Sequence, residues 1–158
     1  MGKVVLKSVQ DRRSLKSILK GEYRPDFNLS YGAFDEECTK SYKYMLDKLS
    51  TKTGEDYIFG KDTCMWAWYQ NPFFKNHINY KNLGVDLVVI TFEIDESQVV
   101  FSDFDAWCER IVAGWGIDVI VDIHSIDKDI SVQAVCWDIP VDGILNIEPF
   151  SNYENDEV

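Results

Sequence analysis

The chain has 158 residues, enough for one domain with a buried core, and its 46% hydrophobic and 14% aromatic content excludes a disordered chain. The net charge is −11, and residues 101–158 alone carry thirteen acidic and two basic side chains. This acidic third should repel nucleic-acid phosphates and attract a basic protein surface, so we expect no direct binding of DNA or RNA.

Other whole-chain features bear on compartment and metals. No apolar N-terminal segment resembles a signal peptide, and no apolar run is long enough to span a membrane. The four cysteines lie far apart, without a Cys-x-x-Cys pair, and the chain has only two histidines. This spacing is not that of a metal site, so we predict no metal, reduced thiols and a cytoplasmic protein without membrane contact.

The first half of the chain predicts a strand and two helices. Val4–Val9 is rich in β-branched residues and reads as an opening strand, and a helix is expected from Asp11 to Lys20, ended by Gly21. A second helix follows a loop, because apolar residues recur there at spacings of three and four. They are Phe34, Cys38, Tyr42, Met45, Leu46 and Leu49.

The segment Cys64–Pro72, with the sequence CMWAWYQNP, is the most aromatic part of the chain. Its aromatic density and its closing proline favour a strand. In a strand Trp66 and Trp68 point to the same face, whereas in a helix they would diverge by about 200°. We therefore predict one indole surface on one side of a sheet, either packed as core or bordering a site.

The second half is read mainly as strands. They are expected at residues 85–94, 98–101, 131–140 and 143–150, with a helix over 102–113 capped by Ser102 or Asp103. Residues 116–123 read as a further strand or as a short extension of that helix. Together these elements predict a single α+β domain over residues 1–150, in which helices flank a twisted, mostly antiparallel sheet. A split sheet is the variant of this fold, and residues 151–158 are expected to form a flexible acidic tail.

Few residues suggest chemistry, and each also has an ordinary structural explanation. Trp66, Trp68 and Tyr69 could stack on a planar ligand or simply pack in the core. The pair Asp103 and Asp105 could serve acid–base catalysis, but acidic residues also favour any helix N-terminus. Gln133 lies in an apolar strand, on the same face as Val135 and Trp137, so its amide needs a hydrogen-bond partner from protein or ligand.

Several segments resemble an uncharacterised family of bacterial and phage proteins, domain of unknown function 3841. The resemblance lies in CMWAWYQ, in LVVITFEIDESQVVFSDFDAW and in SVQAVCWDI. With Tyr44-Met45 and the opening strand, it touches most of the chain from Val4 to Phe150. The Ser-Asp-Phe-Asp-x-Trp segment is its most specific part. This family has no established activity, so the resemblance implies a fold more than a function.

The order of the elements also resembles that of ADP-ribosyltransferase-type domains, in which a split sheet holds NAD in a cleft. The resemblance implies that Lys7 on the first strand grips the cofactor and that Gln133 on a late strand orients a ribose. Lys7 stands where such domains carry His or Arg. Gln133 lacks the negative charge that would stabilise an oxocarbenium-like transition state, so an altered or inactive active site is implied.

Three functional hypotheses follow, and whether the protein is an enzyme is left open. The first is an ADP-ribosyltransferase-like NAD- or nucleotide-binding domain that uses Lys7, Gln133 and the aromatic segment. The second is a non-enzymatic module, phage-encoded or defence-related, whose acidic residues Asp127, Asp129 and Asp142 dock on a basic partner. The third is a stable domain whose aromatic strand belongs to the core.

Overall fold

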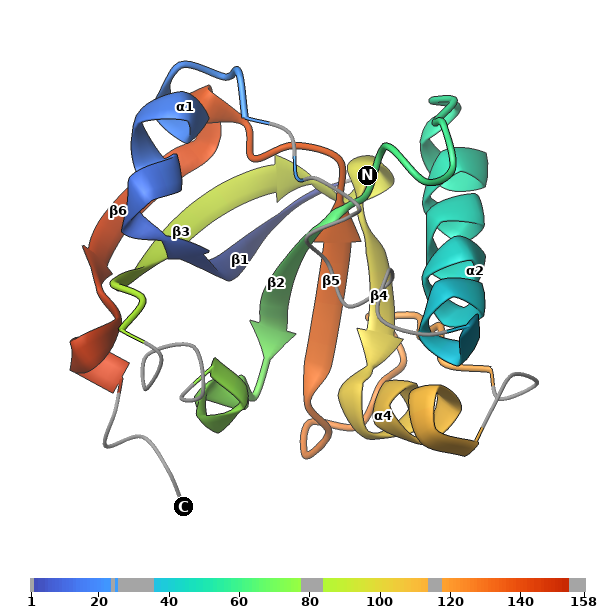
Figure 1. Cartoon of the computed structure of the whole chain (residues 1–158). Helices are drawn as coiled ribbons and strands as arrows, with labels where there is room; N and C mark the ends of the chain where they lie inside the picture. Colours follow the sequence, from blue (N-terminus) through green and yellow to red (C-terminus); the bar gives the residue numbers. More distant parts are fainter. Residues whose placement is uncertain (1, 24, 26–35, 78–83, 114–117, 154–158) are drawn as a thin grey trace.

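The structure is a computed structural model of the whole chain, and it describes residues 2–23, 25, 36–77, 84–113 and 118–153 (Figure 1). Its helices are α1 (Leu15–Leu19), α2 (Glu36–Thr53) and α4 (Phe104–Ala113). Its strands are β1 (Lys3–Asp11), β2 (Met65–Gln70), β3 (Leu87–Asp95), β4 (Val100–Asp103), β5 (Val132–Cys136) and β6 (Ile144–Pro149). Short 3-10 helices are η1 (Arg12–Ser14), η4 (Phe74–His77), η5 (Glu96–Gln98), η6 (Val141–Gly143) and η7 (Phe150–Tyr153).

The strands form one open sheet in the order β4-β5-β2-β1-β3-β6, with antiparallel pairing. β1 pairs with β3 along its whole length, from Lys3 opposite Asp95 to Asp11 opposite Leu87. β1 pairs with β2 at one position, where Lys7 lies opposite Trp68. The sheet therefore consists of two three-stranded halves that meet at this pair, and the predicted α+β fold is confirmed.

The two faces of the sheet bury different side chains, as the alternation within β2 predicts. Met65, Ala67 and Tyr69 pack on one face, in a cluster that includes the fully buried Leu6 and Phe92. Trp66 and Trp68 point to the opposite face. The predicted strand over the aromatic segment is thus confirmed, and so is the shared face of the two indoles.

Helix α2 covers the face of the sheet that carries the indoles. Tyr42, Met45, Leu46 and Leu49 are buried along its length and pack in one cluster with Trp107 of α4. Burying a side chain of this size stabilises the fold by about 1.5–3 kcal/mol. Figure 1 shows α2 and α4 beside β4 and β5, whereas α1 lies at the other end of the sheet, near β6. The periodicity that predicted the second helix therefore marked its buried side correctly.

One predicted element is confirmed with a change, and another is wrong. The segment expected as a helix from Asp11 to Lys20 is helical over residues 12–19, but its first turn is the 3-10 helix η1 and only Leu15–Leu19 is α-helical. It starts after Asp11, where pairing of β1 with β3 ends and the Asp11 side chain accepts a hydrogen bond from the Arg13 backbone N–H. The expected strand over 116–123 reduces to one isolated bridge, between Ile120 and Ser102, within the part of that segment that the structure describes. There the apolar residues Val121 and Ile123 pack against the core without forming a ladder.

Asp103, not Ser102, caps helix α4. Its Oδ1 accepts from the backbone N–H groups of Asp105 at 3.0 Å and Ala106 at 3.3 Å. Asp105 lies in the first turn of the helix, where a negatively charged carboxylate interacts favourably with the helix dipole. Capping and the helix dipole therefore account for the carboxylates of Asp103 and Asp105 without acid–base catalysis, and Ser102 is not the cap.

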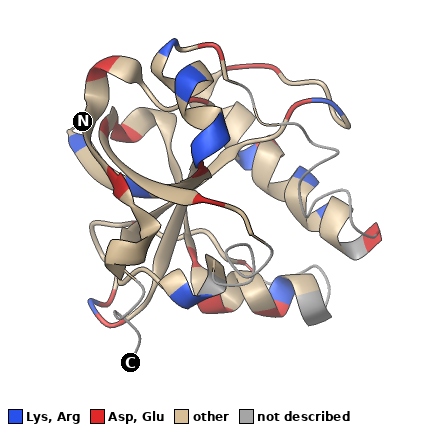
Figure 2. Cartoon of the chain, turned by 60° about the vertical axis from the view of Figure 1, so that its left-hand side comes forward, with Lys and Arg blue, Asp and Glu red and all other residues tan. Residues whose placement is uncertain are grey.

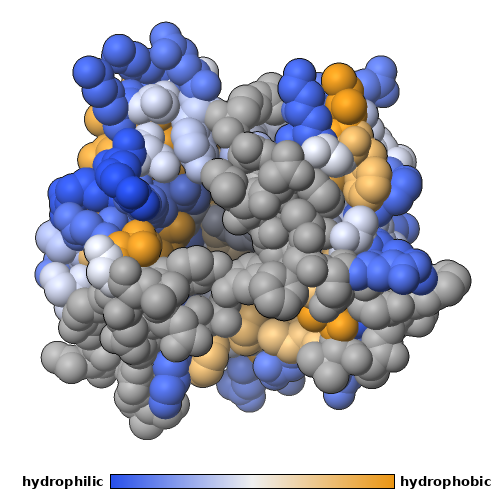
Figure 3. Space-filling view, in the orientation of Figure 1, coloured by the Kyte–Doolittle hydropathy of each residue, from blue (hydrophilic) through white to orange (hydrophobic). Residues whose placement is uncertain are grey.

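The described surface is mixed in charge and polarity. Figure 2 shows acidic and basic residues spread over helices and loops, and the coloured part of the face in Figure 3 carries hydrophilic residues beside separate apolar patches. None of the helices in the described ranges is long and apolar enough to cross a lipid bilayer. Of the predicted tail, residues 151–153 belong to η7, and residues 154–158 lie outside the described part of the chain.

Candidate functional site

A row of side chains crosses the middle of the sheet on the face that carries the indoles. The registers place Thr91 opposite Lys7, Lys7 opposite Trp68, Trp68 opposite Gln133, and Gln133 opposite Ser102. Directly opposed side chains on neighbouring strands have Cβ atoms about 5 Å apart. Lys7, Trp68 and Gln133, three of the five residues predicted from the sequence, are therefore neighbours in space. We call the five residues in register, Thr91, Lys7, Trp68, Gln133 and Ser102, the transverse row.

Lys7 lies next to Thr91, towards the more exposed end of the transverse row. Its Nζ donates to the hydroxyl of Tyr153 at 2.9 Å and to Thr91 Oγ1 at 3.3 Å. Both acceptors are neutral, and no carboxylate among the described residues forms an ion pair with Lys7. The ammonium is thus held in place by hydroxyl groups, and the Tyr153 hydroxyl also interacts with the Glu148 carboxylate.

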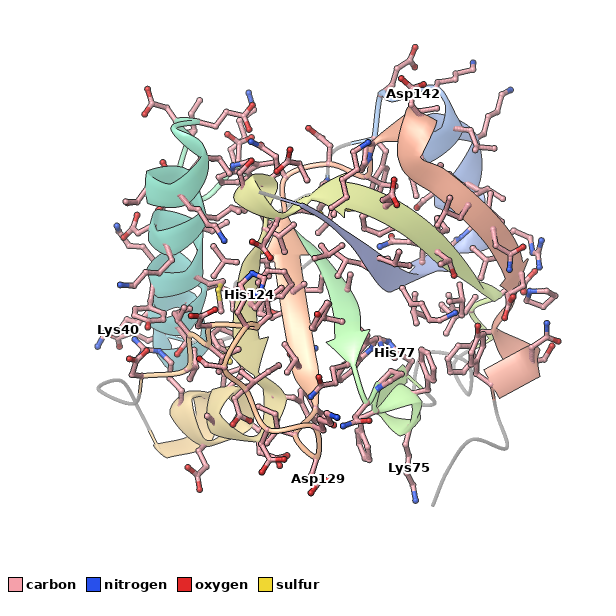
Figure 4. The ribbon with its side chains drawn as sticks, turned by 180° about the vertical axis from the view of Figure 1, so that it is seen from behind. Lys40, Lys75, His77, His124, Asp129 and Asp142 are labelled. Carbon is pink, nitrogen blue, oxygen red and sulfur yellow. The ribbon has the colours of Figure 1, made fainter. Side chains whose placement is uncertain are left out.

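Trp68 occupies the centre of the row and is 3% exposed. Its indole Nε1 donates to His77 Nε2 at 3.1 Å, and His77 comes from η4, below the end of β2 (Figure 4). Burial lowers the pKa of His77 to about 4. A neutral imidazole is required here, because only the neutral ring can accept a hydrogen bond. His77 therefore fixes the direction of the Trp68 ring.

The rings of Trp68 and Phe104 lie 5.0 Å apart, in an edge-to-face arrangement. Trp68 belongs to β2, and Phe104 is the first residue of α4, directly after β4; β2 and β4 are the strands on either side of β5. The Phe104 backbone N–H donates to the Ser131 carbonyl oxygen, just before β5 begins. Trp68 is therefore packed edge-to-face against Phe104 and is a wall of the site, not an open stacking surface.

Gln133 and Ser102 form the buried end of the row. Gln133 is 7% exposed and Ser102 is fully buried. Neither Gln133 Oε1 nor Ser102 Oγ has a hydrogen-bond partner among the residues that the structure describes. Leaving a buried polar atom without a partner costs about 1–3 kcal/mol, so two such atoms side by side are unusual. For the amide oxygen of Gln133, the partner that the sequence predicted is not found within the described chain.

The other two predicted residues lie outside the row. Trp66 packs against Trp107 and Tyr42, with ring centroids 5.1 and 5.7 Å away, under α2 and α4. Tyr69 points to the opposite face of the sheet, where its ring contacts Phe101 at 5.1 Å. The predicted aromatic set therefore divides into Trp68 at the site and two core residues.

Four residues at or next to the row were not predicted from the sequence: Thr91, Ser102, His77 and Tyr153. A histidine in a polar loop is typically solvated, and the sequence gives no sign that His77 accepts from Trp68. The sequence indicates a possible helix cap at Ser102 and no contact with Gln133. The signal that could have found it is the strand register, because Ser102 lies opposite Gln133 only in the pairing that β4 and β5 adopt.

The cysteines provide no second chemical centre. All four are free thiols, and Cys38, Cys64 and Cys136 are buried. Burial raises the pKa of Cys64 to about 12 and also raises that of Cys136, so neither forms a thiolate at neutral pH. Within the described ranges, no group of three or more histidine, cysteine or carboxylate side chains is placed to bind a metal ion.

A separate cavity of about 500 Å³ opens where β1 begins and β3 and β5 end. Its wall includes Trp137 and Pro140, and its carboxylates come from several elements. The charged lining residues are Glu55, Glu93, Asp95, Asp138, Asp142 and a single cation, Lys3. Lys3 lies 3.8 Å from Glu93, so most of the acidic charge is not balanced by this amine. We call this the acidic cavity.

The three acids proposed from the sequence to dock on a basic partner do not share one surface. Asp142 lines the acidic cavity, whereas Asp129 lies at the opposite end of the molecule (Figure 4). Asp127 is close to Asp129 and accepts a hydrogen bond from its backbone N–H. Charge in the C-terminal third is thus divided between two distant places.

Comparison of the chain with known protein families, with curated proteins and with solved structures finds no match.

Proposed function

We propose that the transverse row binds NAD or a related nucleotide, as in the layout of ADP-ribosyltransferase-type domains. The observation that carries the proposal is the row itself: Lys7, Trp68 and Gln133 lie side by side on β1, β2 and β5. These are the strands from which that layout draws its cofactor contacts. Lys7 would hold a phosphate, and Gln133 would accept a hydrogen bond from a ribose hydroxyl.

The residues present suit such a ligand at both ends. At one end is an ammonium whose described partners are neutral hydroxyls, and at the other is a buried amide oxygen in need of a donor. Neighbouring strands are about 4.8 Å apart, so Lys7 and Gln133 are separated by roughly 10 Å at their backbones. Trp68 stands between the two side chains, so a phosphate-bearing sugar would reach from one to the other only after the indole has moved.

The site as described is closed, which defines how a ligand would enter. Gln133 is 7% exposed and its neighbour Trp68 is 3% exposed, so side chains at the row must move before a ligand reaches Gln133. Binding then selects an open form of the protein, and the apparent affinity for the ligand is reduced in proportion to the small population of that form. We propose binding without transfer chemistry, because Gln133 cannot supply the negative charge that favours an oxocarbenium-like transition state.

Calorimetric titration with NAD tests the proposal. The wild type should release or absorb heat with a saturable profile, and Lys7→Met should bind roughly 10- to 100-fold more weakly, since a charge-assisted hydrogen bond contributes about 1.5–3 kcal/mol. Tyr69→Phe is the matched control, because Tyr69 lies on the opposite face, and it should bind as the wild type does. Absence of heat with the folded wild type would overturn the proposal.

The acidic cavity favours a second candidate function, the docking of a basic protein segment. Five carboxylates from loops and strand ends face one cavity with one lysine, so a lysine- or arginine-rich segment would be attracted there. An arginine-rich peptide should bind with an affinity that falls steeply with salt. Asp142→Lys should weaken this binding, whereas Asp129→Lys, at the other end of the molecule, should not. Equal effects of the two reversals would exclude the cavity as the docking site.

A further inference from the structure

Ser102, in the edge strand β4, differs from the other fully buried serine in the described strands, Ser8 of β1. Ser8 Oγ donates to the Trp66 carbonyl oxygen at 2.8 Å and accepts from Gln10 Nε2 at 2.7 Å. Ser102 Oγ has no such partner in the described chain. The sheet can thus satisfy a buried serine hydroxyl, and it does so at one position but not at the other.

Ser102 also lies directly opposite Gln133, whose Oε1 is the second buried oxygen without a partner on this face. The two oxygen atoms do not bond to each other. An amide oxygen can only accept, whereas a serine hydroxyl can accept and donate. Together they match a group that offers one donor to Gln133 and a second hydroxyl to Ser102. Because both side chains are neutral, they suit an uncharged group better than an ion.

We infer that Ser102 is a ligand-binding residue and that Ser102 and Gln133 together hold the two adjacent hydroxyls of a ribose. This inference rests on the proposed function and adds a residue and a chemical preference to it. The row then has a direction: the phosphate lies at Lys7, towards the surface, and the sugar diol lies at the buried end. In the free protein the Ser102 hydroxyl has no partner and lowers the stability, and in the complex the ligand supplies that partner.

The first test compares Ser102→Ala with Ser8→Ala in the absence of ligand, by thermal melting. Removing a buried hydroxyl that has no partner should raise the melting temperature, whereas removing one with two partners should lower it. Ser8 is the matched control, since both residues are fully buried serines in strands of the same sheet. A fall in melting temperature for Ser102→Ala as large as that for Ser8→Ala would show that Ser102 Oγ is already bonded, and would overturn the inference.

The second test measures binding of NAD and of two NAD analogues, each lacking the 2′-hydroxyl of one ribose, by calorimetry. Ser102→Ala should bind NAD about 3- to 10-fold more weakly than the wild type, the loss expected for one neutral hydrogen bond. One analogue should bind the wild type more weakly by a similar factor, and this difference should shrink in Ser102→Ala.

The outcomes separate the two proposals. If the wild type binds NAD and Ser102→Ala binds it equally well, the role of Ser102 is refuted and the proposed function stands. If both analogues bind the wild type as well as NAD does, the diol contact is refuted. If the wild type binds no NAD, the proposed function fails, and with it the ribose contact, whatever the melting temperatures of the two serine variants.

Discussion

The protonation of His77 gives a direct test of the geometry around Trp68. Burial lowers the pKa of this imidazole from 6.5 to about 4, and its Nε2 must stay unprotonated to accept from the indole. In the unfolded chain the imidazole keeps its ordinary pKa, so between these two values the unfolded state binds more protons. The stability contributed by neutral His77 is therefore complete above pH 6.5 and is lost as the pH falls towards 4.

The magnitude follows from the size of the pKa difference. A difference of roughly 2.5 units corresponds to an upper limit of about 3 kcal/mol in the free energy of unfolding. Because the His77 side chain keeps part of its surface in contact with water, we expect about 1–2 kcal/mol between pH 7 and pH 4.5.

The assay is urea unfolding of the wild type and His77→Gln across this pH range. Glutamine can still accept from the Trp68 indole through its amide oxygen, but it does not titrate. The wild type should lose stability relative to His77→Gln as the pH falls, since all other titrating groups are shared. Parallel stability curves for the two proteins would refute a buried, neutral His77 bonded to Trp68.

The remaining predictions concern elements outside the site. His124 Nε2 lies 2.8 Å from the Glu96 carboxylate, and this hydrogen bond raises the pKa of His124. The stability that charged His124 contributes to the fold is therefore present below pH 6.5 and is lost as the pH rises through the raised pKa. His124→Gln should remove this loss of melting temperature on the alkaline side. Asp103→Ala should cost about 1 kcal/mol in urea unfolding through loss of the α4 cap, and no change would contradict the capping role. Gly143→Ala should lower the melting temperature, because its Cβ would stand 2.1 Å from the Glu93 carbonyl oxygen; an unchanged melting temperature would show that the loop has room.

Much of the fold was predictable because alternation and helical periodicity report which face of an element is buried. The strand over Met65–Gln70 and the stripe of α2 followed from these patterns. The short α1 and the lack of a strand at residues 118–123 did not, because they depend on how far β1 pairs with β3 and on what the later segment packs against. Local sequence does not contain that information.

The candidate site was predictable only in part, for a related reason. Gln133 stood out as an amide in an apolar strand, and the resemblance pointed to Lys7. That Trp68 joins them while Tyr69 does not follows from the faces of β2. Ser102 and His77 reach the row through strand register and a loop contact, which link residues far apart in the sequence.

The most direct test of the central claim is the tryptophan emission of two variants during titration with NAD. Trp68 lies between Lys7 and Gln133, whereas Trp66, on the same strand and face, packs under α2 and α4. Binding at the transverse row predicts a saturable emission change that persists in Trp66→Phe and is lost in Trp68→Phe. A change that survives in Trp68→Phe and disappears in Trp66→Phe, or no change in either protein, would contradict a ligand site at the row.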